Sequence, residues 1–266
     1  MLRTPPIVLT IAGFDPSSGA GITADIKTIG AHGCYGIACI TALTVQSTLG
    51  VRRVQPLAAE LVAETLEELS RDVVPAAVHI GMLSTGDVVR VVVDYLRKHS
   101  APKVVLDPIL QSSSGATLLD YSGKILLLKE LLPIVSVLTP NVDEAAQLTG
   151  IPVGNLDQMR SATVRLHSLG ADAVVVTGGH LAEPTDLLSI RTQGGVRSQV
   201  FGGAKQRTTS THGSGCAFAT SLACNLGLGM DLPDAVRKAK DYVSKAMAAA
   251  YPVGQGLGPL NHLFRK

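Results

Sequence analysis

The sequence predicts an α/β fold in three layers: a doubly wound, mostly parallel sheet with helices on both faces, in a single domain over residues 1–266. Three observations lead to this prediction. Short runs of branched aliphatic residues are apolar on both parities, as in strands covered on both faces. Helical patterns alternate with these runs along most of the chain. Two closely spaced runs within 185–201 predict a hairpin at one edge of the sheet.

The strands are predicted from the apolar runs in chain order. They are Ile7–Ala12, Gly36–Thr41, Ala76–Ile80, Lys103–Leu106, Ile134–Leu138, Ala171–Val176, Thr185–Ile190 and Val196–Phe201. Between them, residues 61–69, 156–169 and 231–250 have apolar side chains at helical spacing. We expect Ser84 to cap a further helix, with Asp87 at its third position, and Asp231 to cap the last helix.

Composition narrows the possible functions. The chain has 266 residues, a formal charge of +2, 17% charged residues, four Phe, five Tyr and no Trp. This balance argues against partners such as nucleic acid or a membrane surface. Four cysteines lack metal-ligand spacing, which favours reduced thiols: Cys34, Cys39, Cys216 and Cys224. Because no run is long and uncharged enough for a transmembrane helix, we expect a cytoplasmic enzyme.

Polar motifs follow the first two strands, where a doubly wound sheet binds its ligands. The loop from Gly13 to Gly21 opens a helix that carries Asp25, and it matches neither a Walker loop nor GxGxxG. Asp25 could bind a substrate donor or only complement the helix dipole. Gln46 lies in a predicted loop, Thr44–Ser47, and its amide suits an amino-heterocycle. A solvated loop glutamine is the simpler alternative.

Acidic residues follow two later strands. Asp107 ends the predicted strand Lys103–Leu106, where a carboxylate can meet a metal–phosphate group or form a simple Asp-Pro turn. Asn141 and Glu144 have the spacing of a capping box, and Glu144 could also lie near a hydrated magnesium ion. Gly178 and Gly179 allow close backbone approach to a ligand, although they also suit a plain turn.

A glycine-rich segment precedes the apolar helix 217–226. Thr211-His212-Gly213-Ser214-Gly215-Cys216 can direct successive backbone N–H groups at an anion. Cys216 falls in the first helical turn, where we expect the thiolate to be favoured. The alternative is a buried cysteine at a helix start. Cys34, Cys39 and Cys224 are expected to be packing residues.

The ordered set of motifs resembles the hydroxymethylpyrimidine/phosphomethylpyrimidine kinases of thiamine biosynthesis. These enzymes belong to the ribokinase-like superfamily and are close to the pyridoxal kinases. The resemblance also includes Ile80-Gly81-Met82-Leu83 and the segment Gly256–His262, and it runs from about residue 6 to His262. It implies phosphorylation, dependent on ATP and Mg²⁺, of 4-amino-5-hydroxymethyl-2-methylpyrimidine to its monophosphate and then to its diphosphate. It also implies a homodimer.

The resemblance assigns roles to individual residues. The pyrimidine is expected to contact Gly13, Asp25, Thr44, Gln46 and Met82. ATP and its phosphates are expected to contact Asp107, Asn141, Thr177, Gly179, His212, Gly213 and Gly215. Asp107 and Glu144 are expected to hold Mg²⁺. Cys216 is expected to be the catalytic base, with Gly213, Ser214 and Gly215 forming the anion hole.

Two departures from the family pattern concern phosphate binding. Many relatives carry lysine where this chain has Ser113 and Thr177. Three other basic residues are candidates to take their place, on sequence proximity only: Lys205, Arg207 and Lys238. Without these two lysines, the affinity for the nucleotide and the preference for a particular phosphate donor could differ from those of the family. Two other functions therefore stay open: a pyridoxal or pyridoxine kinase, and a non-catalytic pyrimidine-binding sensor. A thiol hydrolase built on Cys216 lacks a supporting base.

Overall fold

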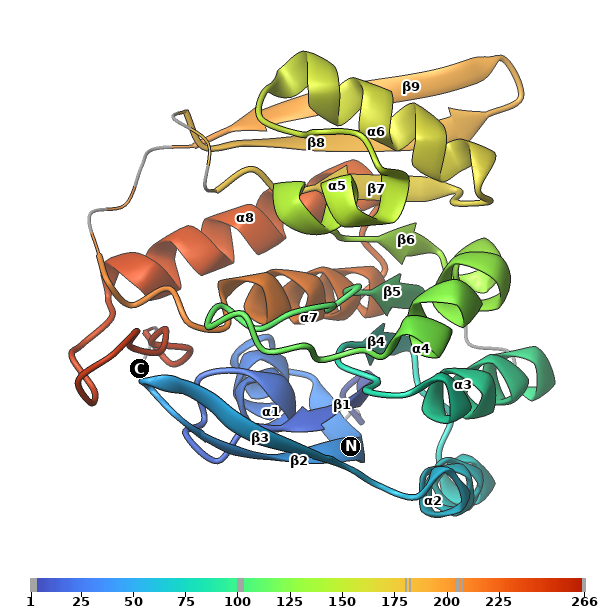
Figure 1. The fold of residues 1–266 in the computed structure, drawn as a ribbon, viewed down its shortest axis with the longest axis vertical. Coiled ribbons are helices and arrows are strands. Elements are labelled where there is room, and N and C mark those ends of the chain that lie inside the picture. Colours follow the sequence, from blue (N-terminus) through green and yellow to red (C-terminus); the bar gives the residue numbers. More distant parts are fainter. Residues whose placement is uncertain are drawn as a thin grey trace.

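Nine strands form one sheet in the computed structural model, which describes residues 4–99, 103–179, 181, 183–203, 206 and 208–264. The sheet order is β3-β2-β1-β4-β5-β6-β7-β8-β9 (Figure 1). The strands are β1 (Ile7–Phe14), β2 (Tyr35–Ser47), β3 (Gly50–Pro56), β4 (Ala77–Ile80), β5 (Val104–Leu106), β6 (Val137–Leu138), β7 (Ala173–Val176), β8 (Thr185–Thr192) and β9 (Gly195–Gly202). The strands from β2 to β7 in this order are parallel, and β3, β8 and β9 add antiparallel edges.

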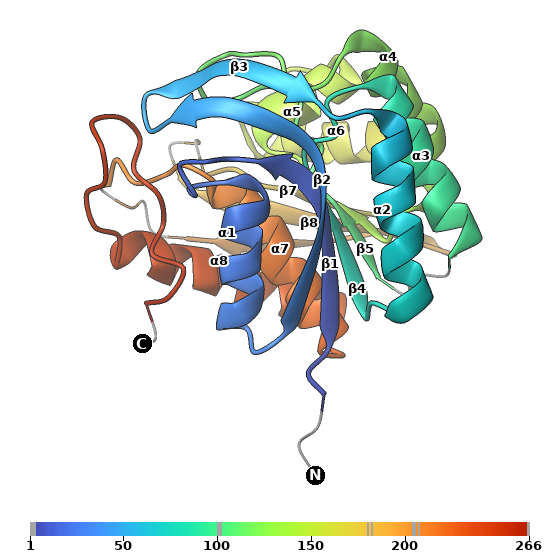
Figure 2. The same cartoon turned by 90° about the horizontal axis from the view of Figure 1, so that it is seen from below.

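Helices cover both faces of the sheet (Figure 2). One apolar cluster lies under α2 (Ala59–Asp72), α3 (Gly86–Lys98), α5 (Val142–Thr149) and α6 (Leu156–Ser168). The opposite cluster lies under α1 (Gly21–Ala31), α7 (Ser214–Gly227) and α8 (Leu232–Ala248). A short helix, α4 (Tyr121–Leu126), continues through a π turn, Leu127–Leu131, into a 3-10 turn, Leu132–Ile134. The predicted fold class is therefore confirmed.

The predicted strands all occur, but their lengths differ and one strand was missed. The predicted strand Ile134–Leu138 is reduced to β6, because the 3-10 turn takes its first residue. β2 extends to Ser47, and β3 pairs with its second half. β3 was missed because its sequence, GVRRVQP, has no continuous apolar run and none of its residues is buried. The hairpin predicted at one edge is β8–β9.

The caps of three helices test the capping predictions. Asp231 caps α8 by accepting from the backbone N–H of Asp234. Asn141 and Glu144 form the expected reciprocal capping box of α5. The prediction that Ser84 caps α3 is wrong, because Thr85 is the N-cap residue and its side chain accepts from the backbone N–H of Val88. Ser84 lies one residue before the cap, in a left-handed conformation with φ of 70°.

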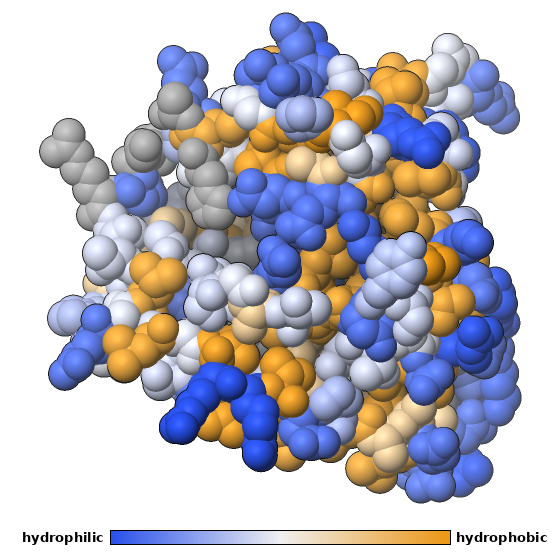
Figure 3. Space-filling model, in the orientation of Figure 1, coloured by the Kyte–Doolittle hydropathy of each residue, from blue (hydrophilic) through white to orange (hydrophobic). Residues whose placement is uncertain are grey.

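The surface mixes polar and apolar side chains (Figure 3). In the described part of the chain, no helix combines the length and apolar character needed to cross a membrane. The carboxyl ends of the parallel strands meet at one edge of the sheet, where the first residues of α7 also lie. This edge is where the polar motifs come together.

Candidate active site

A cavity of about 600 Å³ lies at the carboxyl ends of the parallel strands. It gathers residues that are more than 200 positions apart in the sequence, including the end of β1 and the start of α7. Every residue expected at the site lines it except Gly179, which is exposed beyond β7. The neighbouring His180 and two of the suggested cations, Lys205 and Arg207, lie outside the described residues.

The start of α7 presents backbone N–H groups to this cavity. Gly213 is the N-cap residue in the left-handed region, with φ of 77°, and no side chain caps the helix. The N–H of Ser214 donates to the Thr211 carbonyl, whereas a helix leaves its next N–H groups without backbone acceptors. A side chain at Gly213 would collide with the Gly19 carbonyl, so this position requires glycine for both space and conformation. The arrangement is that of an anion-binding helix terminus.

Two buried carboxylates lie opposite this helix start. Asp107 follows β5 and is 4% exposed; Glu144 lies in the first turn of α5 and is 8% exposed. Burial raises the pKa of Asp107 to about 6, with Asp25 adding to the rise and His79 and Cys216 opposing it. Burial and the nearby Asp107 charge raise the pKa of Glu144 well above its usual range. One oxygen of Glu144 serves the capping box, and the two carboxyl groups form an acidic wall of the cavity.

The Cys216 thiol lies between the helix start and this acidic wall. It lines the same cavity as Asp107, Asp25 and Glu144, close enough for their charges to act on the thiol. Burial raises the pKa of Cys216 well above the value of a free thiol, and Asp107 and Asp25 raise it further. The expectation of a favoured thiolate is therefore wrong for the protein chain alone, because desolvation and carboxylate charge outweigh the helix terminus.

Positive charge is scarce around the cavity. Within the described part of the chain, no lysine or arginine lines it. Ser113 and Thr177, which stand at the two family lysine positions, both do. Lys238 is exposed on α8 and is not part of the lining. Side-chain hydroxyls and backbone N–H groups are therefore what this wall offers to an anion.

Asp25 lies at the bottom of the cavity in a closed hydrogen-bond cluster. It is completely buried, and its two oxygens accept from the hydroxyls of Thr10 and Thr220, each at 2.7 Å. His79 Nδ1 lies 3.4 Å from the same carboxylate. Burial alone would lower the pKa of His79, but Asp25 and Asp107 outweigh it and raise it. Each oxygen of Asp25 is thus already engaged by a hydroxyl group within the protein.

Sequence reasoning missed His79, although a signal was present. It is a fully buried polar residue in the middle of the apolar strand β4. A polar side chain at such a position requires a buried partner. Its other ring nitrogen, Nε2, is buried and has no hydrogen-bond partner in the described structure.

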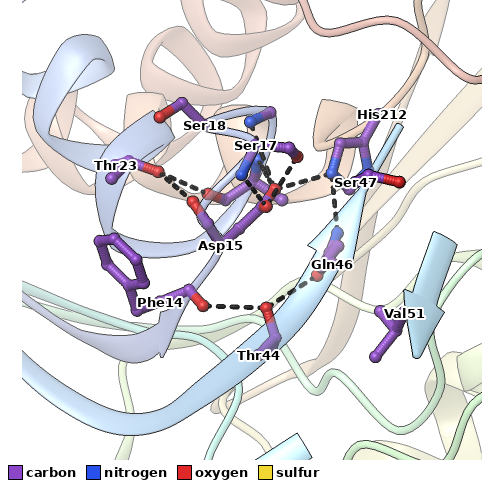
Figure 4. A network of polar contacts seen from close by, with 12 residues as sticks. Phe14, Asp15, Ser17, Ser18, Thr23, Thr44, Gln46, Ser47, Val51 and His212 are labelled. Atoms are coloured by element: carbon purple, nitrogen blue, oxygen red, sulfur yellow. Dashed lines mark hydrogen bonds and ion pairs between the residues drawn. The ribbon is translucent and has the colours of Figure 1, made fainter. Parts of the chain in front are cut away.

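Gln46 stands at the opposite end of the cavity, on β2 rather than in a loop. The loop prediction was wrong because pairing with β3 extends β2, with a register shift between Val45 and Gln46. The Gln46 amide lies between two partners, with Oε1 placed 3.2 Å from Thr44 Oγ1 and Nε2 placed 3.1 Å from His212 Nε2 (Figure 4). Thr44 also donates to the Phe14 carbonyl at 3.0 Å. The backbone of His212 belongs to the glycine-rich segment, but its side chain faces Gln46.

Asp15 is a second residue that sequence reasoning missed. Its carboxylate accepts hydrogen bonds from the backbone N–H groups of Ser17, Gly19 and Ala20 and from the Ser17 hydroxyl. It also accepts from His212 Nε2 at 2.8 Å (Figure 4). Burial alone would raise the pKa of Asp15, but the bonds from His212 and Ser17 outweigh burial and lower it. The pattern Asp15-Pro16-Ser17-Ser18 is a signal for such a side-chain turn.

Gly13 and Met82 form the apolar part of the cavity. A side chain at Gly13 would come within 2.9 Å of Met82 Sδ, so glycine lets β1 pass close to this side chain. Met82 belongs to a small apolar cluster with Ala42 and Leu118. The substrate end of the cavity therefore combines a flat apolar wall with the polar groups of Gln46 and Thr44.

The fold and this cavity place the chain among the α/β kinases that bind a small substrate and nucleotide phosphates at one sheet edge. A sequence model of the phosphomethylpyrimidine kinase family matches residues 15–261. A Streptomyces coelicolor hydroxymethylpyrimidine/phosphomethylpyrimidine kinase is 40% identical over 260 residues, which are 97% of this chain and 95% of the relative.

Two solved structures are similar over nearly the whole fold. A phosphomethylpyrimidine kinase from Clostridium difficile is 36% identical, with a TM-score of 0.79, and the match covers 91% of this chain and 99% of that one. An ADP complex of Bacillus subtilis pyridoxal kinase is 29% identical, with a TM-score of 0.88 and 97% coverage of both chains. The chain belongs to the phosphomethylpyrimidine kinase family, as the motif resemblance predicts.

Proposed function

We propose that this chain transfers a phosphoryl group from ATP to the hydroxymethyl group of 4-amino-5-hydroxymethyl-2-methylpyrimidine, and then a second one to the resulting monophosphate. One observation carries the proposal. The uncapped start of α7 and a buried acidic pair face a polar and apolar substrate end within a single cavity. Phosphoryl transfer requires this combination of positioning and charge stabilisation.

The phosphate end supports ATP and Mg²⁺ as the ligands. Asp107 and Glu144 are buried oxygen ligands, and both pKa values are raised by burial and by a nearby carboxylate: Asp25 acts on Asp107, and Asp107 acts on Glu144. A hard divalent cation fits such a pair, since Mg²⁺ prefers one or two carboxylates together with phosphate oxygens. When bound, Mg²⁺ would neutralise phosphate charge that no described lysine or arginine reaches. Asn141 and Thr177, at the same edge, would contact the nucleotide.

Cys216 is proposed to be the base for the alcohol. It stands in the first turn of α7, beside the helix start where the phosphates would lie, and a cation bound at Asp107 would offset the carboxylate charge that keeps the thiol protonated in the protein alone. An alcohol must lose a proton during the transfer, so a base helps. A phosphate monoester has a second pKa near 6 and is largely ionised at neutral pH, so the second transfer needs none.

A pyridoxal kinase is the second candidate, favoured by the structural similarity to the Bacillus subtilis enzyme. Both candidate substrates carry a hydroxymethyl group on a substituted six-membered aza-ring. The family sequence match favours the pyrimidine.

The test is a coupled assay of ADP release with ATP, Mg²⁺ and each acceptor in turn: the pyrimidine alcohol, its monophosphate and pyridoxal. We expect turnover of both pyrimidines, with a higher kcat/KM for the alcohol than for pyridoxal. Preferred turnover of pyridoxal would replace the proposal by the second candidate. Binding of the pyrimidine in calorimetry without ADP release would instead identify a sensor. The homodimer and the cytoplasmic location stay predictions.

A further inference from the structure

The Gln46 side chain lies beside two groups whose protons restrict how its amide can be oriented. His212 Nε2 lies 2.8 Å from Asp15 and 3.1 Å from the Gln46 amide (Figure 4). The two ends of an amide are distinguished by their partners: the oxygen only accepts and the nitrogen only donates. The proton inventory of Asp15, His212 and Thr44 therefore decides which end of Gln46 faces which neighbour.

Asp15 requires a proton on His212 Nε2. The Asp15 carboxylate already accepts four hydrogen bonds from the loop 17–20, which favour its ionised form. An ionised carboxylate cannot donate, so the 2.8 Å contact with His212 needs an N–H on Nε2. This holds for the neutral imidazole and for the imidazolium. Nε2 therefore has no lone pair left to accept a bond from Gln46.

The Thr44 hydroxyl, at the other end of the Gln46 amide, favours the same amide orientation. Its hydroxyl has one proton, which the Phe14 carbonyl accepts at 3.0 Å. The oxygen is then free to accept from Gln46 at 3.2 Å but cannot donate to it. With Gln46 Oε1 toward His212 and Nε2 toward Thr44, no two donors and no two acceptors face each other; the opposite orientation places Nε2 against the His212 N–H and Oε1 against the Thr44 oxygen.

The ring of His212 is held in this position by packing. A Cβ atom at Gly19 would collide with the His212 ring, so glycine at this position lets the ring lie directly on the loop that Asp15 organises. The side chain of His212 is only 15% exposed. The backbone N–H of His212 also donates to the Gly258 carbonyl at 3.1 Å. The ring is held by its contact with Gly19, and its backbone is held by Gly258, so its Nε2 keeps a fixed position beside the Gln46 amide.

We propose that Asp15 and His212 are a positioning pair that fixes the Gln46 amide with its oxygen toward His212, leaving one N–H of Nε2 directed into the cavity. The substrate end then presents a hydrogen-bond donor at this position and selects an acceptor nitrogen in the ring of the substrate. An exocyclic amino group, which donates, does not satisfy it. The identity of the ring rests on the proposed function, but the orientation of the amide does not.

The first arm of the test reads the amide without turnover. In ¹⁵N-labelled protein, the side-chain NH₂ resonances of Gln46 are assigned by their loss in Gln46→Glu. We expect stronger nuclear Overhauser contacts from these protons to the Thr44 side chain than to the ring protons of His212. Stronger contacts to the His212 ring would overturn the proposal whether or not the protein is a kinase.

The second arm measures selectivity with the pyrimidine alcohol and with analogues in which one ring nitrogen is replaced by CH. We expect one of these replacements to lower kcat/KM about tenfold in the wild type, mostly through KM, because a buried donor loses its acceptor. His212→Phe keeps a ring but removes the N–H, and it should bring this ratio close to one. His212→Gln restores a donor and should recover most of the ratio.

Melting temperatures of both His212 variants verify that they are folded. An unchanged ratio in folded His212→Phe would overturn the positioning role, as would an equal fall in kcat for every acceptor. Lack of any turnover by the wild type would instead contradict the proposed function, and the spectroscopic arm would still decide the orientation.

Discussion

The carboxyl groups at the two ends of the cavity have pKa values shifted in opposite directions. At the substrate end, Asp15 accepts five hydrogen bonds from the protein itself, and these bonds lower its pKa. At the phosphate end, Asp107 and Glu144 are both buried, and burial together with the charge of a nearby carboxylate raises the pKa of each. The substrate end is complete in the protein alone, whereas the phosphate end stores repulsion that a cation would relieve. Recognition is preorganised at one end and depends on a ligand at the other.

The largest expected effect separates the two phosphoryl transfers at Cys216. Cys216→Ala should lower phosphorylation of the alcohol by roughly 10²- to 10⁴-fold, the usual contribution of a general base. Phosphorylation of the monophosphate should change by less than about tenfold, because that acceptor is already ionised. Single-turnover assays of both acceptors measure the difference. Cys224→Ala, two turns further along α7 and buried in the core, is the matched control. An equal loss for both acceptors would contradict this role for Cys216.

A smaller effect is expected from adding a positive charge to the phosphate end. Thr177→Lys should lower the KM for ATP about tenfold, because a charged hydrogen bond to phosphate replaces a neutral one. Thr177 lines the cavity directly after β7 and has no described cation beside it in the lining. Thr177→Met, with similar length and no charge, controls for side-chain size. An equal effect of both substitutions on KM would show that charge is not what the site lacks.

The order of strands and helices could be predicted from the sequence because its apolar runs alternate with amphipathic stripes. The capping box of Asn141 and Glu144 was equally local, since three residues of spacing define it. β3 could not be found in this way. Its polar residues form a strand because β2 continues beyond the core and supplies a partner, so the signal lies in the pairing and not in the segment.

The candidate residues were predictable, but their environments were not. Asp25 was expected to bind substrate, and only the structure shows that Thr10 and Thr220 engage both of its oxygens. Cys216 was expected to favour the thiolate from its place in the first helical turn. Burial raises its pKa instead, and the charge of Asp107, more than 100 positions away, raises it further. Long-range contacts between charged groups set pKa values, and sequence spacing does not reveal them.

The raised pKa of Asp107 predicts a stabilising substitution. The folded value of about 6 lies above the unfolded value of 3.8, so the protonated form is favoured by folding, and that stability is lost as pH rises through 6. Asp107→Asn removes this loss. In EDTA at pH 8 it should raise Tm by roughly 5 °C, and the gain should shrink by pH 5. Scanning calorimetry at the two values measures it. A gain that is larger at pH 5 than at pH 8 would contradict the assignment.

Asp15 should behave in the opposite direction, which makes it the closest check of the comparison between the two ends. Its folded pKa is lowered below 3.8, so its stabilisation is complete above that value and is lost only as pH falls through the folded pKa. Asp15→Asn replaces an acceptor of five bonds with a group that can accept fewer. It should lower Tm by roughly 4 °C, and this deficit should stay constant from pH 8 to pH 5. The Asp107→Asn gain changes over the same interval, so one calorimetric series on three proteins decides both. A deficit for Asp15→Asn that disappears by pH 5 would mean that Asp15 titrates like the phosphate-end carboxylates, and the two ends would then not differ as argued.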